Sequence, residues 1–199
     1  MIDPNDFHEL VEGARTYRRY SGESVPEDVL CELVDAARLS PCGNNMQLLR
    51  FRVVSTDDAD AAQTVFTHLH WAGALKDWDG PEPGERPGGY IVVCLPEKLA
   101  ANPIRLIDTG IASQSIVLAA ATRGLGACMH KSYDASLADD LGLAESGYAV
   151  SMVIALGPRA EKVVLEPSTT DHGLVYWREP DGYHHVPKLS LSDLLIQPV

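Results

Sequence analysis

The sequence has few cysteines, few basic residues and few aromatic residues. Its four cysteines (Cys31, Cys42, Cys94 and Cys128) form no Cys-x-x-Cys pair, which argues against a disulfide scaffold and favours reduced thiols. Lys and Arg number 16 against 28 Asp and Glu, so the formal charge is −12. General binding to nucleic acid or to anionic membranes needs a basic surface, and we expect neither. An anionic ligand would need a local cluster of positive groups.

Long apolar runs are missing as well. The longest, residues 90–95 and 148–156, have the length of strands, well below the roughly 18 residues of a membrane span. Residues 1–6 contain neither a basic region nor an apolar one, so we expect no signal peptide and a cytoplasmic location. With 199 residues, 45% of them apolar, the chain is suited to a single domain with its own core.

Apolar periodicity and turn residues predict an alternation of helices and strands. Asp3 or Asn5 can cap a first helix, Ser24 with Pro26 can open a second, and Asp57 can cap a third. We expect helices over residues 3–14, 24–40, 57–69, 104–123, 134–141 and 190–196, and core strands over 49–55, 90–95 and 148–156. The order indicates an α+β fold, a three-layer arrangement with one central sheet.

The helix predicted at residues 104–123 is apolar almost all round. A helix of this kind is buried, so we expect it at the centre of the molecule, ended by Gly124. One of its sides carries Ile104, Ile107, Ile111, Leu118 and Ala119. The chain beyond Gly157 has little periodicity. We expect residues 158–199 to form an arm whose apolar side chains cover another surface, that of a partner subunit.

The first candidate site is the basic cluster at residues 15–20. Arg15 and Arg18 are three residues apart and share a face in a helical turn. Guanidinium groups bind phosphate through forked donors, and Thr16 adds a hydroxyl. The alternative is a solvated basic patch, and the cluster alone leaves both interpretations open.

The second candidate site is the turn-rich segment at residues 41–47, between a helix and a strand. Gly43 and its following asparagines permit unusual backbone angles. The amides of Asn45 and Gln47 can pair with the donors and acceptors of a planar heterocycle. By itself, the segment is better described as a plain turn.

Taken together and in order, these segments resemble the FMN-dependent nitroreductase family, in its short bacterial branch. Residues 15–20 (RTYRRY) are similar to its Arg-Ser-x-Arg-x-Phe signature, and residues 41–47 (PCGNNMQ) to its Pro-Ser-x-x-Asn-x-Gln loop. Residues 108–114 (DTGIASQ) resemble the start of its central helix, and residues 118–127 the end of that helix and the following glycine turn. The resemblance covers nearly the whole chain, including residues 183–191.

The resemblance implies a three-layer α+β fold with a central, mainly antiparallel sheet flanked by helices, in an intertwined homodimer. It also implies two FMN sites at the dimer interface. NAD(P)H would reduce the flavin, which would pass electrons in ping-pong order to a nitroaromatic, quinone or related acceptor. The cofactor would carry the chemistry, so no side chain acts as a nucleophile and no metal is expected.

The resemblance also implies the residues of the cofactor site. Arg15 and Thr16 would hold the FMN phosphate and ribityl side, and Arg18 would face the pyrimidine edge, where reduced flavin carries negative charge. The loop at residues 41–47 would reach the flavin from the other subunit, and Lys188 would add a phosphate contact. The full set is Arg15, Thr16, Tyr17, Arg18, Pro41, Cys42, Gly43, Asn45, Gln47, Met129, His130, Lys131 and Lys188.

Several positions depart from the family pattern. Ala14 and Leu189 stand where many members carry Arg, which removes two charges from the phosphate site. Cys42 replaces Ser and is a weaker hydrogen-bonding group. We therefore expect modest FMN affinity. Two other functions stay open: a flavin enzyme with a different reaction (reductive dehalogenation, flavin or heterocycle chemistry), and a flavin-free binding or structural dimer.

Four other features of the sequence give little support for a function. Gly124-Leu125-Gly126 lacks the third glycine of a dinucleotide fingerprint and follows a helix rather than a strand. The His68-x-His70 and His184-His185 pairs lack ligands at metal-binding spacing. Cys42 has no identifiable base that would make it a nucleophile. Trp71 and Trp78 could stack over a substrate, but we expect them to pack within the protein.

Overall fold

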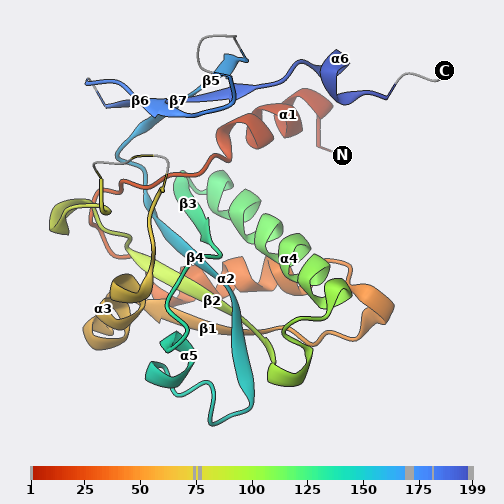
Figure 1. The fold of residues 1–199 in the computed structure, drawn as a ribbon, viewed down its shortest axis with the longest axis vertical. Coiled ribbons are helices and arrows are strands. Elements are labelled where there is room, and N and C mark those ends of the chain that lie inside the picture. Colours follow the sequence, from red (N-terminus) through yellow and green to blue (C-terminus); the bar gives the residue numbers. More distant parts are fainter. Residues whose placement is uncertain (1, 74, 76–77, 169–172, 181, 197–199) are drawn as a thin grey trace.

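A four-stranded antiparallel sheet forms the middle of the molecule in the computed structural model, which describes residues 2–73, 75, 78–168, 173–180 and 182–196. The strand order is β1-β2-β4-β3, with β1 at Arg50–Ser55, β2 at Gly89–Pro96, β3 at Leu125–His130 and β4 at Tyr148–Pro158. Helices α2 (Glu27–Arg38) and α4 (Pro103–Thr122) cover one face, and α3 (Ala59–His68) and α5 (Leu137–Asp140) cover the other (Figure 1). The predicted three-layer α+β fold is confirmed.

Strand β2 shows why the sheet is central. Its side chains alternate between the two faces, so Tyr90 and Val92 join the core on the α3 side, while Ile91 and Val93 join the core on the α2 and α4 side. All four are at most 2% exposed. The prediction of a strand buried on both faces is confirmed, and the two cores hold the helical layers against one sheet.

The helix starts are partly as predicted. Asp3 caps α1 (Pro4–Gly13) by accepting a hydrogen bond from the backbone of Asn5. Ser24 does not cap α2, which begins after Pro26 without a side-chain cap. Asp58, rather than Asp57, caps α3, because it is Asp58 that accepts the amide hydrogen of a residue in the first turn. Neighbouring aspartates look alike in the sequence, and only the backbone geometry selects one.

Helix α4 is central but not buried all round, which corrects the expectation for its apolar side. Ile104 is 51% and Ile107 is 62% exposed. Eight other side chains of the helix are buried: Arg105, Asp108, Thr109, Ala112, Ser113, Ile116, Val117 and Ala120. Small and polar residues allow α4 to approach its neighbours closely, and the large aliphatic residues near its start lie outside. Its length and hydropathy would suit a membrane span, but this partial burial is that of a core helix.

The chain beyond β4 contains a second sheet, which the sequence analysis did not predict. Strands β5 (Lys162–Pro167), β7 (Tyr183–Lys188) and β6 (Trp177–Arg178) lie in that order, with β5 and β7 parallel. Helix α6 (Leu191–Leu194) follows, capped by Ser190. In Figure 1 this sheet lies above the central layers, with α1 beside it, and both described ends of the chain lie at that side. The association of residues 158–199 with a partner subunit stays a prediction. Short 3₁₀ turns occur at Gly43–Asn45, Pro83–Glu85 and Glu97–Leu99.

Candidate functional site

The segment that follows α1 runs along β3. Thr16 forms an isolated parallel bridge with Ala127, and the amide of Tyr17 donates a 3.0 Å hydrogen bond to the carbonyl oxygen of Ala127. A cavity of about 150 Å³ lies between this segment, α1, α4 and β3. We call it the β3 pocket, and it is lined by Val11, Ala14, Arg15, Thr16, Gln114, Val117, Ala127 and Met129. Three of the predicted cofactor residues, Arg15, Thr16 and Met129, thus meet at one cavity.

Arg15 is available for an anion. Its guanidinium makes one long hydrogen bond, 3.4 Å from Nη1 to the carbonyl oxygen of Val11. Among the described residues, no carboxylate lies within ion-pair distance of it. The neighbouring Thr16 is exposed, so its hydroxyl can also reach a ligand in the β3 pocket. The pocket therefore offers a cation and a hydroxyl, the donor types that bind a phosphate.

Tyr17 packs inside the molecule. Its side chain is 6% exposed and lies against Gly126, where a Cβ atom would come within 2.8 Å of the tyrosine Cβ and Cγ. Its hydroxyl donates a 3.2 Å hydrogen bond to the carbonyl oxygen of Gly13. The glycine turn after α4 thus allows the N-terminal segment to approach β3, and the contribution of Tyr17 in the described fold is packing.

Arg18 is positioned through its backbone by a buried carboxylate. The carboxylate of Glu161 accepts hydrogen bonds from the backbone amides of Arg18 and Arg19. It also forms an ion pair with Arg178, at 2.9 Å. The side chain of Glu161 is 1% exposed. The Arg18 guanidinium lies over the ring of Tyr176, 5.1 Å from its centroid. Glu161, which directly precedes β5, therefore fixes the backbone of the segment that carries Arg18, the cation predicted to face the flavin.

The predicted cofactor-binding segment at residues 129–131 divides between surface and core. Met129 is 40% exposed and faces the β3 pocket. His130 is 5% exposed and meets Trp71 edge to face at 4.6 Å. Burial, helped by the charge of Arg18, lowers the pKa of His130 to about 4, so the ring is neutral at neutral pH. Lys131 donates a 2.8 Å hydrogen bond from Nζ to the carbonyl oxygen of Ser151.

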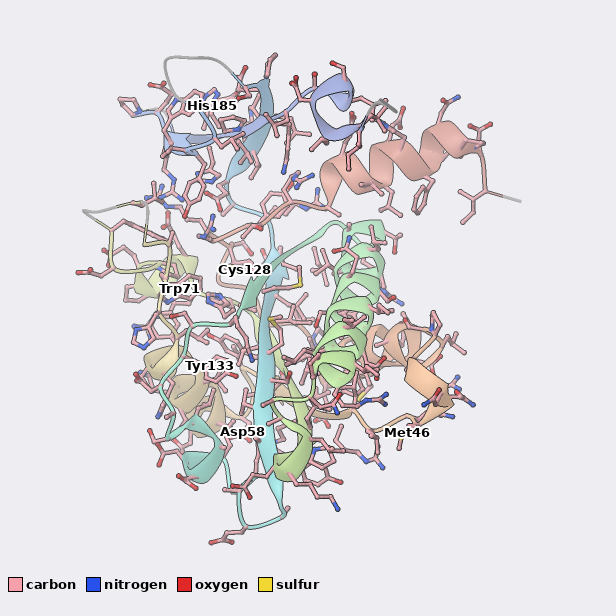
Figure 2. The ribbon with its side chains drawn as sticks, turned by 45° about the vertical axis from the view of Figure 1, so that its right-hand side comes forward. Met46, Asp58, Trp71, Cys128, Tyr133 and His185 are labelled. Atoms are coloured by element: carbon pink, nitrogen blue, oxygen red, sulfur yellow. The ribbon has the colours of Figure 1, made fainter. Side chains whose placement is uncertain are left out.

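The loop at residues 41–47 borders a second cavity, of about 250 Å³. We call it the loop pocket, and its lining includes Pro41, Cys42, Gln47, Phe51, Asp108 and Ala112. Asn45 and Gln47 are exposed, and the amide nitrogen of Gln47 donates a 3.2 Å hydrogen bond to Oδ1 of Asn45. The backbone amide of Gln47 donates to Sγ of Cys42 at 3.3 Å. Figure 2 places Met46, from the same loop, at the outer edge of the molecule.

The two pockets lie on different sides of α4. Asp108 and Ala112 line the loop pocket, whereas Gln114 and Val117 line the β3 pocket. Successive residues of an α-helix are rotated by about 100° around its axis. By the shorter way round, Gln114 therefore points about 120° and Val117 about 180° away from Asp108. One chain therefore presents the two predicted halves of the cofactor site in nearly opposite directions.

The remaining candidates lie outside these pockets. Lys188 ends β7 and is exposed. Trp71 packs against Phe66, Trp78 and His130, as expected for a packing residue. The histidines at 68 and 70 pair with separate aspartates, Asp140 at 2.8 Å and Asp134 at 2.9 Å. In the part of the chain that the structure describes, no cluster of three or more His, Cys, Asp or Glu could hold a metal.

Comparison with known proteins identifies the family. A family model described as the nitroreductase family matches residues 11–158. This range contains all the residues that line the β3 pocket and the loop pocket. The chain belongs to the nitroreductase family. Membership places it among oxidoreductases, as the sequence motifs predicted.

Relatives of this nitroreductase-family chain span most of its length. YdgI of Bacillus subtilis (strain 168), named as an NAD(P)H nitroreductase, is 25% identical over 81% of this chain and 92% of its own. A solved structure from Desulfovibrio desulfuricans, described as a nitroreductase in complex with FMN, covers 100% of this chain and 99% of its own at a TM-score of 0.68 and 23% identity. One from Parabacteroides distasonis covers 79% and 89% at a TM-score of 0.63 and 24% identity. These solved structures show the fold.

Sequence reasoning missed two groups that hold the site segments. Arg105 and Asp108 form a buried ion pair that binds the backbone of Gly43, and Glu161 binds the backbone at Arg18. A signal for the pair was present, because these are the two charged residues of α4. No signal marked Glu161, which lies in a polar segment and acquires its role from the fold.

Proposed function

We propose that this chain is an FMN-dependent oxidoreductase that transfers hydride from NAD(P)H to a nitroaromatic, quinone or related acceptor in ping-pong order. The observation that carries the proposal is the grouping of the predicted residues. Arg15, Thr16 and Met129 meet at one pocket, while Cys42 and Gln47 border the other. Bound FMN would supply the hydride-accepting and hydride-donating centre, and the protein would supply binding, orientation and charge.

The residues present fit an anionic flavin cofactor. Arg15 and Thr16 offer phosphate donors beside an exposed cavity, and no described carboxylate competes for the arginine. Burial keeps the nearby His130 neutral at neutral pH, so this histidine adds no second positive charge beside Arg18. A fixed cation stabilises negative charge that develops on a reduced flavin ring. The absence of Arg at positions 14 and 189 supports modest rather than tight phosphate binding.

A homodimer would complete the site. Because the β3 pocket and the loop pocket point to different sides of α4, we infer that each cofactor takes the β3 pocket of one protomer and the loop of its partner. Large apolar side chains are exposed on three elements, as expected of a face that a second copy covers. They include Phe7 and Val11 on α1, Ile104 and Ile107 on α4, and Leu191 and Leu194 on α6. The C-terminal arm would then lie on the partner subunit, and the dimer would act in the cytoplasm.

Steady-state kinetics test the reaction. NADH and NADPH are each varied at several fixed concentrations of a nitroaromatic, a quinone or a halogenated phenol. Ping-pong transfer predicts parallel lines in double-reciprocal plots, with turnover of the nitroaromatic or quinone. Turnover of the halogenated phenol alone would favour reductive dehalogenation, and no NAD(P)H oxidation with any acceptor would contradict the proposal.

A further inference from the structure

The loop at residues 41–47 is clamped from α4 by two buried charged residues. We propose that Arg105 and Asp108 are positioning residues, which fix the backbone of Gly43 and so hold Asn45 and Gln47 in the conformation that contacts the flavin. This inference rests on the proposed function for its ligand. The clamp itself is a feature of the described chain.

Both polar groups of one peptide residue are held. Oδ1 of Asp108 accepts a 2.8 Å hydrogen bond from the amide of Gly43, while Nη1 and Nη2 of Arg105 each lie 3.3 Å from the carbonyl oxygen of Gly43. Nη1 of Arg105 also pairs with Oδ2 of Asp108 at 3.0 Å, and both side chains are 5% exposed. The four contacts form a closed network, in which each charged side chain contacts both the other side chain and the backbone of Gly43.

Glycine at position 43 leaves room for this close approach. A Cβ atom at position 43 would lie 2.6 Å from Nη2 of Arg105 and 2.6 Å from Cγ2 of Ile104. The closeness of the Arg105 and Ile104 side chains to the Gly43 backbone, rather than an unusual φ, therefore explains Gly43. The arginine and the glycine act as one unit, and a side chain at position 43 would displace the guanidinium.

The segment held in this way is strained. Asn44, Asn45 and Gln47 have φ values of 55°, 51° and 49°, in the left-handed region, which asparagine tolerates better than other residues with a Cβ and which is least usual for Gln47. Such conformations persist where the surroundings enforce them, and they concentrate at binding and catalytic sites. A connection between a helix and a strand does not need three of them. The strain and the clamp together indicate a loop whose exact shape matters, and its exposed amides are the groups predicted to meet the flavin.

The clamp is anchored in the central sheet. Oγ1 of Thr109, the residue after Asp108, lies 3.0 Å from Oγ of Ser151 on β4 and donates a 3.0 Å hydrogen bond to the carbonyl oxygen of Arg105. A buried ion pair is a weak source of stability, because desolvation of both charges offsets their attraction. Stability alone therefore does not explain why α4 places its two charges here, whereas loop positioning does.

The test compares a double variant with a control in the same helix. Arg105→Met with Asp108→Leu removes both charges together, so no unpaired charge stays buried and the fold is expected to survive. Gly43→Ala disturbs the same contacts from the loop, because its Cβ atom would lie 2.6 Å from Nη2 of Arg105. Ser113→Ala is the control, since the buried Ser113 hydroxyl has no hydrogen-bond partner in the described chain and lies outside both pockets. Flavin fluorescence titration gives the FMN dissociation constant, and thermal melting reports the fold.

We expect wild type and Ser113→Ala to bind FMN equally, and the double variant and Gly43→Ala to bind at least tenfold more weakly, with the melting temperature of the double variant close to that of wild type. Equal affinity in all four proteins would overturn the clamp's role but leave the proposed function intact. No FMN binding by wild type would overturn the proposed function, and with it this role.

Hydrogen exchange of the wild-type protein keeps the test independent of how the variants fold. The Gly43 amide is expected to exchange slowly although its loop is exposed, because its acceptor is the buried carboxylate of Asp108. Exchange of this amide at the rate of an unstructured peptide would show that no clamp exists in solution.

Discussion

At the level of single residues, Arg18 is the cation that we propose to face the flavin. Its backbone is held by Glu161 and its guanidinium lies over Tyr176, so the cation has a defined place next to β3. The sequence motif predicted the importance of Arg18, but not the carboxylate that positions it. Glu161 lies 143 residues away along the chain, and no local pattern links two such positions.

We predict that Arg18→Ala weakens FMN binding by roughly 10- to 100-fold, because a hydrogen bond to a charged group is worth about 1.5–3 kcal/mol. Loss of the cation also destabilises reduced flavin, so the midpoint potential should fall by about 30 mV for each 1.4 kcal/mol lost. Fluorescence titration and a redox titration measure the two effects. Arg19→Ala is the matched control, since Arg19 pairs with Glu85 at 3.2 Å. Unchanged affinity and potential in Arg18→Ala would remove the role given to this residue.

Buried histidines give a pH dependence of stability. Burial lowers the pKa values of His130 and His184 from 6.5 to about 4 in the folded protein. Between pH 6.5 and 4 the unfolded chain therefore binds more protons than the folded one, and stability falls as the pH is lowered through this window. For His130 the loss is at most about 3 kcal/mol.

We predict that the melting temperature of the purified protein falls from pH 7 to pH 4.5 and that His130→Gln makes this slope shallower. The exposed His8, on α1, provides the control, because His8→Gln should leave the slope unchanged. Differential scanning calorimetry across the pH range measures both. An identical slope in His130→Gln and wild type would show that His130 titrates normally in the folded state.

At the level of elements, sequence patterns located the helices and three of the four strands of the central sheet, but predicted their buried faces less well. Strand β2 could be predicted, since a continuous apolar run fits a strand covered on both sides. The buried side of α4 could not, because a helix that is apolar all round contains no signal for its orientation. The C-terminal strands were missed because β5 and β7 show no clear alternation of apolar and polar residues.

The exposed part of α4 yields a prediction about assembly. Ile107 is 62% exposed on a helix whose other side is buried, so it contributes little to the fold of one chain. We predict that Ile107→Glu weakens the dimer at least tenfold, measured by sedimentation velocity across a concentration series. Thr67→Glu, at an exposed position of α3 on the opposite face of the sheet, is the control. A dimer as tight as that of wild type would place the interface elsewhere.

At the scale of the whole molecule, the C-terminal arm is expected to join two subunits. Truncation before Gly173 removes β6, β7 and α6, and we predict that the product no longer forms the dimer. A milder variant, Leu191→Ser with Leu194→Ser, keeps the second sheet but removes apolar side chains that are 72% and 63% exposed. If the arm packs on the partner, the dimer of this variant dissociates at a higher protein concentration than the wild-type dimer in sedimentation. An intact dimer in both cases would show that the arm serves its own chain.

If the molecule holds FMN as proposed, the purified protein has a flavin spectrum, and its visible absorbance shows this without any assumption about the electron acceptor. The chromophore is released by heat and identified by chromatography, after incubation with excess FMN and removal of the free cofactor. We predict a flavin spectrum and released FMN, which would leave the electron acceptor as the open question. A protein that stays colourless after this treatment would show that the chain does not bind FMN and would indicate a flavin-free binding or structural dimer.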